Sequence, residues 1–245
     1  MPPIAVTKQV LKLSGVDFTL QDHTGLDYSN ADMTRAQLLG TILIKSNLSN
    51  ANLTNADLFE AKLNEANMHE ATLTLASLNK ANLTSATATR VDFTSASMVR
   101  VTLFKTDLSG SDLSSAKLRY SICIETKFIN TDLTNTDFKQ ADLTNSIFDY
   151  STLQFTKFRK VTAIKTSFKQ VEAQAANFEY AILTKADFSK SNLTGAFFFH
   201  ADLTDAIFID TIVTNATFAG AKMKAALKQH LHDVGANVDE VILVT

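Results

Sequence analysis

Tryptophan is absent from this sequence of 245 residues, and cysteine, proline and glycine are scarce. The chain holds one Cys, 2 Pro and 7 Gly. The single cysteine, Cys123, excludes an internal disulfide, so the fold tolerates a reducing compartment. Because Gly and Pro are not enriched, the marked excess of Ala, Thr, Asn and Leu, with 17 Phe, indicates a repeat rather than disorder.

Neither an excess of charge nor a long apolar run is present. The net charge is −2 at pH 7, so the field of the whole molecule does not favour nucleic acid or anionic membranes. No segment approaches 18 apolar residues, and the first eight residues lack a charged stretch followed by a long apolar one. We therefore expect a soluble, cytoplasmic protein with no membrane partner.

A large apolar residue recurs at every fifth position from Leu13 to Met223. Counting in steps of five from 13 to 223 gives 43 positions, and only seven of them are not Leu, Phe or Met. The seven are His23, Tyr28, Ala88, Cys123, Ala163, Ala173 and Val213. Two residues before each large residue, from Ala31 to Ala221, the chain always has Ala, Ser, Thr or Val.

A period of five fits neither a helix nor a simple strand. In a helix, successive large residues would lie about 140° apart and would cover every face. In a strand, an odd step would move the large residue to the opposite face at each unit. A step of two along a strand, followed by a step of three round a corner, keeps all of them on the inside. The chain is therefore predicted to coil around its own apolar side chains as a solenoid.

The repeated unit resembles that of the pentapeptide-repeat family. Its tandem pattern Ala-(Asp/Asn)-Leu-Xaa-Xaa is seen at residues 51–53, 56–58, 141–143 and 201–203, among many others. The resemblance implies an all-β fold, a right-handed quadrilateral parallel β-helix in which four units make one coil, hence nearly 11 coils. We expect three segments: an N-terminal lead-in or cap (1–12), the β-helix (13–221) and a C-terminal helix with an extended tail (222–245).

The C-terminal segment changes period. Apolar residues from Met223 to Val234 follow helical spacing, and Gly235 stands where a helix would end. A helix is predicted from about Lys222 to Asp233, followed by a short strand or extended tail. In the family, similar elements often cap the rod and pair two subunits, which makes a homodimer the expectation and a monomer with a folded-back tail the alternative. The candidate dimerisation residues are Leu227, Leu231, Val241, Ile242 and Leu243.

Residues that could do chemistry are scattered rather than clustered. A rod filled with Leu and Phe offers no concave site in which titratable groups converge. Cys123 occupies a large inward position, where a buried inert thiol is expected rather than a nucleophile. The histidines do not have the spacing of metal ligands, and no Gly-rich phosphate loop is present. We predict no catalytic site, no metal, no cofactor and no enzymatic activity.

Assigning every fourth unit to the same wall gathers basic residues on one wall, where Asp137 is the main acidic residue. These candidate partner-binding residues are Lys80, Arg100, Lys117, Arg119, Lys139, Lys157, Arg159 and Lys160. The wall is either a solvated face or a docking surface.

Three functions follow from such a rod. The first is a non-enzymatic scaffold that binds an unidentified protein partner through an outer wall. The alternative, implied by the family resemblance, is binding and protection of DNA gyrase by mimicry of DNA, as in fluoroquinolone resistance; the near-neutral charge opposes it. Binding of nucleic acid along the basic wall is a third function, which is opposed by the small number of aromatic residues expected there.

Overall fold

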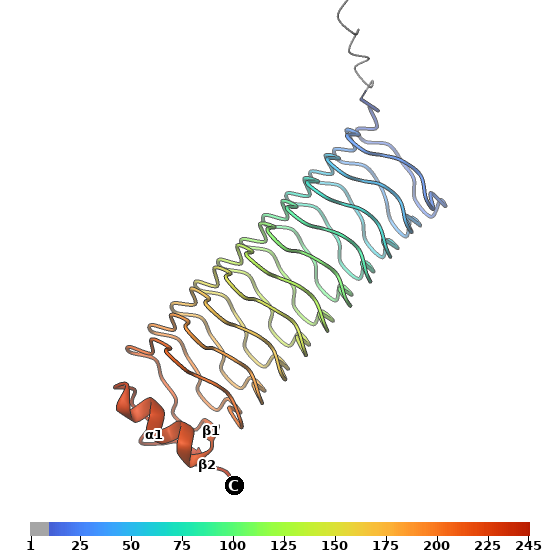
Figure 1. The fold of residues 1–245 in the computed structure, drawn as a ribbon. Helices are drawn as coiled ribbons and strands as arrows, with labels where there is room; N and C mark the ends of the chain where they lie inside the picture. Colours follow the sequence, from blue (N-terminus) through green and yellow to red (C-terminus); the bar gives the residue numbers. More distant parts are fainter. Residues whose placement is uncertain (1–9) are drawn as a thin grey trace, which may run out of the picture.

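The computed structural model describes residues 10–245, which form a straight rod (Figure 1). Successive coils follow one another from the N-terminal to the C-terminal end. Regular elements of more than one residue lie at the C-terminal end of this described part: strand β1 (Lys222–Met223), helix α1 (Ala225–Asp233) and strand β2 (Ile242–Leu243). Most of the predicted lead-in, residues 1–9, lies outside the described residues.

Each coil takes 20 residues and has four walls. A residue forms a parallel bridge with the residue 20 positions later, as Asp32 does with Asn52, and Asn52 with Thr72. Within one coil the bridges fall five residues apart, at residues 32, 37, 42 and 47. A wall therefore contributes one bridged residue per coil, because the chain turns a corner before a longer strand can form. The predicted all-β solenoid is confirmed, with walls that are ladders of single bridges.

The corners are made by residues with a positive φ, and most of them are not glycine. At the fifth residue of the unit, φ is 57° at Asn50, 55° at Glu60 and 60° at Leu75. This conformation costs a residue with a Cβ about 1–2 kcal/mol. The corner amide bonds to the next coil, as Asn50 N does to His69 O at 2.8 Å. These hydrogen bonds between coils hold each corner in a conformation that it would otherwise avoid.

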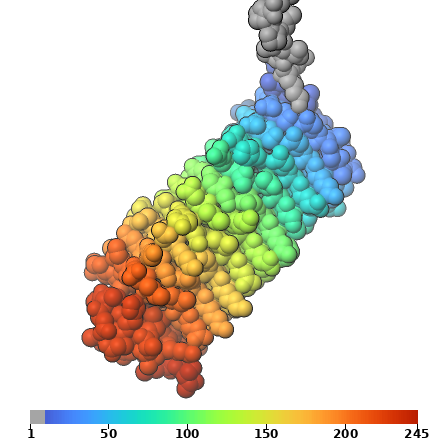
Figure 2. All heavy atoms as spheres, viewed as in Figure 1, coloured from blue at the N-terminus to red at the C-terminus, as the bar shows by residue number. Residues whose placement is uncertain are grey.

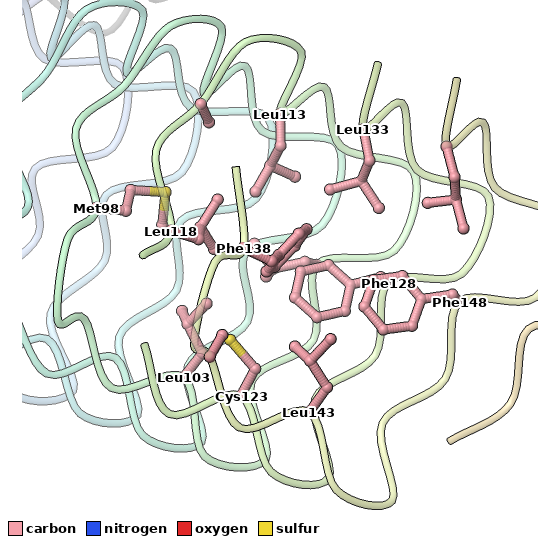
Figure 3. Packing of buried hydrophobic residues seen from close by; sticks show 14 of the residues in the cluster. Met98, Leu103, Leu113, Leu118, Cys123, Phe128, Leu133, Phe138, Leu143 and Phe148 are labelled. Carbon is pink, nitrogen blue, oxygen red and sulfur yellow. The ribbon is translucent and has the colours of Figure 1, made fainter. Parts of the chain in front are cut away.

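The interior is filled by ladders of large apolar side chains, one from each coil, as Leu113 and Leu133 illustrate (Figure 3). In the C-terminal half, phenylalanines alternate with smaller residues along the array and stack coil on coil along two opposite walls. Ring centroids of Phe128 and Phe148 are 4.5 Å apart, and those of Phe138 and Phe158 are 5.3 Å apart. The two ladders meet edge to face across the interior, with Phe128 and Phe138 5.6 Å apart. Stacked and edge-to-face rings are both favourable arrangements.

Hydroxyl groups are accommodated inside the rod because each finds a carbonyl oxygen. Thr106 Oγ1 donates to Leu83 O at 2.7 Å, and Thr136 Oγ1 donates to Leu113 O at 2.7 Å. Both threonines are fully buried. Ser and Thr can therefore replace Ala at the small inward position without leaving an unsatisfied donor.

The C-terminal segment completes the rod as a cap. Lys222 still bridges Asp202, so α1 begins at Ala225 rather than near Lys222 as predicted. After α1, Gly235 adopts a φ of 85° and its amide bonds to His232 O, which ends the helix. The tail then rejoins the ladder: Asn237 bridges Thr217, and β2 pairs in parallel with β1. No helix within residues 10–245 is long and apolar enough to cross a membrane.

The outer surface of the rod is closed by side chains. The space-filling view shows a filled cylinder without a deep cleft on the visible side (Figure 2). At the N-terminal end, where His23 and Tyr28 replace large apolar residues, the interior is filled by Phe18, His23 and Tyr28. The His23 imidazole and the Tyr28 hydroxyl are hydrogen-bonded to each other, so these two inward polar groups are partners.

Candidate functional site

The eight predicted basic residues lie on one wall of the rod, called here the basic face. The bridges run from Ser97 to Lys117, then to Asp137 and to Lys157, which places these side chains in one ladder. Backbone hydrogen bonds connect the flanking ladders: Arg100 N donates to Arg119 O at 2.9 Å. Residues 60 positions apart in the sequence, such as Arg100 and Lys160, are therefore only three coils apart along the same wall.

The corner conformation directs part of the basic face outward. Lys80, Arg100 and Lys160 occupy corner positions with φ of 60°, 59° and 60°, and all three are exposed. Their amides bond to the next coil, as Lys160 N does to Glu179 O at 2.9 Å. The backbone beneath these cations is therefore fixed by the solenoid, while their long side chains extend into solvent.

Three of the eight cations are paired with carboxylates. Arg119 Nε lies 2.6 Å from Asp137 Oδ2, Lys80 Nζ lies 2.9 Å from Glu60 Oε1, and Arg159 Nε lies 3.4 Å from Glu179 Oε2. The other five form no ion pair with any of residues 10–245. These unpaired cations are Arg100, Lys117, Lys139, Lys157 and Lys160.

Positive charge is concentrated in the middle of the basic face. Its outward positions between residues 97 and 160 carry seven cations and one carboxylate, a net charge of +6. The whole chain has a net charge of −2. The basic face is thus a local feature, and it attracts anionic groups that approach within about a Debye length, near 8 Å at physiological salt.

Aromatic residues that the sequence analysis did not single out accompany these cations. The Arg100 guanidinium lies 5.9 Å from the Tyr120 ring centroid, and Arg159 and Lys160 lie 5.5 and 5.8 Å from that of Tyr180. Tyr120 and Tyr180 are 45% and 40% exposed. Comparing the non-basic outward residues at the same 20-residue spacing would have placed both on this wall.

A shallow hollow of about 370 Å³ lies at the N-terminal part of the basic face. Its lining residues are Phe59, Asn79, Lys80, Ser97, Val99, Arg100 and Tyr120. Asn79 Oδ1 accepts hydrogen bonds from Ser97 Oγ at 2.7 Å and from Val99 N at 2.9 Å. The Asn79 side chain is therefore held in place, and two pairs of a cation and an aromatic ring, Lys80 with Phe59 and Arg100 with Tyr120, line the hollow.

The sequence matches the family model described as pentapeptide repeats in 8 copies, over residues 12–50, 51–87, 96–135, 126–162 and 174–208. The chain belongs to the pentapeptide-repeat family.

Solved structures similar to this pentapeptide-repeat chain include HetL, a pentapeptide repeat protein involved in heterocyst differentiation regulation from the cyanobacterium Nostoc sp. strain PCC 7120. It is 26% identical, over 86% of this chain and 92% of that chain, with a TM-score of 0.38. A trypsin-treated form of QnrB1, a plasmid-mediated fluoroquinolone resistance protein, is 17% identical over 76% and 97% of the two chains, with a TM-score of 0.49. No curated protein sequence matches the chain significantly.

Cys123 lies in the interior of this pentapeptide-repeat rod, where the sequence analysis placed it. Its side chain is fully buried, and burial raises the pKa of the thiol to about 12, with the nearby charge of Asp142 acting in the same direction. The thiolate that nucleophilic chemistry needs is not formed near neutral pH. Among residues 10–245, no group of three or more His, Cys, Asp or Glu side chains could hold a metal ion.

The candidate dimerisation residues have different environments. Leu231 of α1 is fully buried, and Leu227 and Val241 pack against the core of the same chain. These three residues close the end of the rod, so Leu231 is not available as a contact surface. Ile242 and Leu243 of β2 are 49% and 55% exposed. A hollow of about 270 Å³ lies beside the tail, between residues 216–219 and residues 237, 239 and 240.

Proposed function

We propose that this protein is a non-enzymatic scaffold that binds a protein partner through the basic face. The observation that carries the proposal is the set of five unpaired cations on a wall whose middle has a net charge of +6. Charges of one sign held close together repel one another, and an opposite charge on a partner relieves that repulsion.

The construction of the rod supports binding rather than catalysis. The backbone under the basic face is held by bridges between every pair of coils, so it loses little conformational freedom when a partner binds. The hollows on the surface are shallow, and Cys123 is buried inside the rod. Catalytic groups require a concave site that excludes water, and a convex rod does not provide one.

Protection of DNA gyrase is the alternative function of such a rod. A mimic of duplex DNA has to present carboxylates in place of phosphates along its length. The basic face presents the opposite charge, which opposes this alternative. A gyrase supercoiling assay with a fluoroquinolone tests it directly: we expect micromolar protein to leave inhibition by the drug unchanged, and restored supercoiling would favour DNA mimicry.

We further propose that two rods associate through their C-terminal ends. Ile242 and Leu243 are exposed on β2, which has no neighbouring strand on its outer side within the described chain. Exposed strand edges with apolar side chains favour pairing with a second edge. Light scattering on the full chain should give about twice the monomer mass of 26.8 kDa. A monomer mass at all concentrations would leave the tail as a cap alone.

A capture experiment tests the scaffold. The immobilised full chain is incubated with a lysate of its source organism, and bound proteins are identified by mass spectrometry. A photoreactive amino acid at Gln140 on the basic face, or at Thr144 on a neighbouring wall, then reports which wall touches the captured protein. We expect crosslinks from Gln140 and few from Thr144. A partner that crosslinks only through Thr144 would leave a scaffold that uses another wall, and the absence of any captured protein would overturn the proposal.

A further inference from the structure

We infer that the basic face binds an extended acidic segment that carries an apolar anchor, lying along the wall from Lys80 to Phe199. This inference rests on the proposed scaffold function and names the chemistry of the partner. Its basis is the order of features along one wall: a cationic stretch first, and an exposed aromatic cluster beyond it.

The cationic stretch is neutralised only in part by carboxylates of the chain. Elsewhere on the rod, several cations pair with carboxylates one coil away: Lys45 Nζ with Glu65 Oε2 at 3.6 Å, Lys105 Nζ with Glu125 Oε2 at 3.6 Å, and Lys127 Nζ with Asp107 Oδ2 at 3.4 Å. On the basic face, Asp137 pairs with Arg119 and Glu179 pairs with Arg159. Five cations have no carboxylate partner among residues 10–245: Arg100, Lys117, Lys139, Lys157 and Lys160. Carboxylates of a bound segment would occupy the positions that internal acids fill elsewhere.

An aromatic cluster follows the cations at the C-terminal end of the same wall. Phe197 and Phe199 are 41% and 37% exposed. The Tyr180 ring lies 5.9 Å from that of Phe199 and 5.3 Å from that of His200. His200 in turn lies against Gly220, where an added Cβ would clash with the imidazole. Clustered exposed aromatics beside arginine are typical of the residues that dominate protein interfaces.

The dimensions fit a short extended segment. Coils are spaced by about 4.8 Å, the distance between neighbouring strands. Four coils separate Lys80 from Lys160, and about two more lead to Phe199, which gives a wall roughly 29 Å long. An extended chain advances about 3.3 Å per residue, so about nine residues span this length. Acidic residues would lie over Arg100 to Lys160, and an apolar side chain would reach the cluster at Phe197 and Phe199.

The arrangement of rings favours a polypeptide over single-stranded nucleic acid. Arg100 lies over the Tyr120 ring, and Arg159 and Lys160 lie over the Tyr180 ring, so a base that stacks there has to compete with these cations. These tyrosines are also three coils apart, about 14 Å, whereas neighbouring nucleotides of one strand lie about 3.4 Å apart when stacked. Stacking platforms for successive bases need closer spacing.

Fluorescence anisotropy with defined probes tests the inference on the full chain. The probes are fluorescein-labelled 12-residue peptides of repeated Glu-Glu-Leu, of repeated Gln-Gln-Leu and of Glu alone, and a 12-nucleotide oligo-dT. The charge-reversal variant is Lys157→Glu with Lys160→Glu. The matched control is Lys165→Glu with Lys185→Glu, since Lys165 and Lys185 are likewise exposed, without an ion pair to residues 10–245, and on a neighbouring wall. Thermal melting of each variant verifies that it folds.

We expect the Glu-Glu-Leu peptide to bind at about 50 mM salt at least tenfold more tightly than the Gln-Gln-Leu peptide. Lys157→Glu with Lys160→Glu should weaken it at least tenfold, and the control should change it less than twofold. Phe199→Ala should weaken Glu-Glu-Leu binding more than Glu-only binding. Equal effects of the two charge variants, no binding of the acidic peptide, or oligo-dT binding as tightly as the peptide would each overturn the inference. If a partner captured from lysate is retained by Lys157→Glu with Lys160→Glu, the scaffold function stands and this inference fails.

Discussion

Arg119 and Asp137 join two neighbouring coils through a hydrogen-bonded ion pair, with Nε 2.6 Å from Oδ2. The other carboxylate oxygen of Asp137 accepts the amide of Lys139 at 3.0 Å. Asp137 is almost fully buried, whereas Arg119 is half exposed. Asp137 thus neutralises Arg119 within the wall, and both of its oxygens are occupied, so it is not shared with Lys117 or Lys157 of the same ladder.

Removal of this carboxylate should destabilise the rod. Asp137→Ala leaves the Lys139 amide and the Arg119 guanidinium without their acceptor, and we expect it to lower the free energy of unfolding by about 1–3 kcal/mol. Asp137→Asn keeps an acceptor for the amide and should cost less. Urea denaturation followed by circular dichroism measures both, and equal losses would show that the amide hydrogen bond contributes nothing.

Two phenylalanines three residues apart should differ strongly in their contribution to stability. Phe158 is fully buried between Phe138 and Phe178, so Phe158→Ala should cost about 3–5 kcal/mol by leaving a cavity in the stack. Phe155 is 55% exposed, and Phe155→Ala should cost less than about 1 kcal/mol. The measurement is the melting temperature of each variant. Similar melting temperatures for the two variants would contradict the placement of Phe158 inside the rod and Phe155 on its surface.

Glycine at a corner should stabilise the chain. Ala175 has a φ of 55°, a conformation that glycine adopts without the clash of a Cβ. We expect Ala175→Gly to raise the free energy of unfolding by about 0.5–1 kcal/mol. The neighbouring Ala176 is fully buried. Ala176→Gly should lower the free energy of unfolding, because it removes a buried methyl group and gives the unfolded chain more conformational freedom. We therefore expect chemical denaturation to show a higher free energy of unfolding for Ala175→Gly and a lower one for Ala176→Gly than for the wild type.

Acid should weaken the turns in which an aspartate accepts hydrogen bonds two residues ahead. At Asp32, bonds from the Thr34 hydroxyl at 2.6 Å and amide at 3.1 Å hold the pKa of the carboxyl below its usual range. Since the folded pKa is the lower one, the stabilisation is complete above the unfolded pKa and is lost as pH falls through the folded pKa.

Asp32→Asn keeps an acceptor that does not titrate. The melting temperature of the wild type should therefore fall relative to that of Asp32→Asn as the pH is lowered below about 4. If the melting temperatures of the two proteins fall by the same amount from neutral to acid pH, Asp32 is not a source of the acid sensitivity.

The thiol of Cys123 should be protected from alkylation in the folded protein. Full burial keeps a maleimide from reaching the sulfur, and a pKa raised to about 12 keeps the thiol protonated at neutral pH. We expect labelling only in denaturant, at one thiol per chain, as followed by mass spectrometry. Stoichiometric labelling of the native protein at neutral pH would show that the wall opens at this coil.

The solenoid could be predicted in detail because its determinants are local and repeated. The step of five identifies the inward residues, such as Leu143 and Phe158, without any knowledge of contacts between coils. The alternation of Phe with smaller residues is equally local, and in a four-walled coil it places Phe128 and Phe138 in ladders on opposite walls. The predicted start of the C-terminal helix was less accurate, because Lys222 still forms a parallel bridge with Asp202 and the helix begins only after it.

The sequence by itself determined the period, the inward side chains, the burial of Cys123 and the wall on which the basic residues lie. Only the tertiary structure decided which side chains meet across coils: Arg119 with Asp137, Lys160 with Tyr180, and Leu231 with the interior. The physical reason is that inward positions follow from an apolar pattern repeated every five residues, whereas pairing on the surface joins residues about 20 positions apart. Such pairs depend on side-chain reach and on competition among several neighbours, which no local pattern encodes.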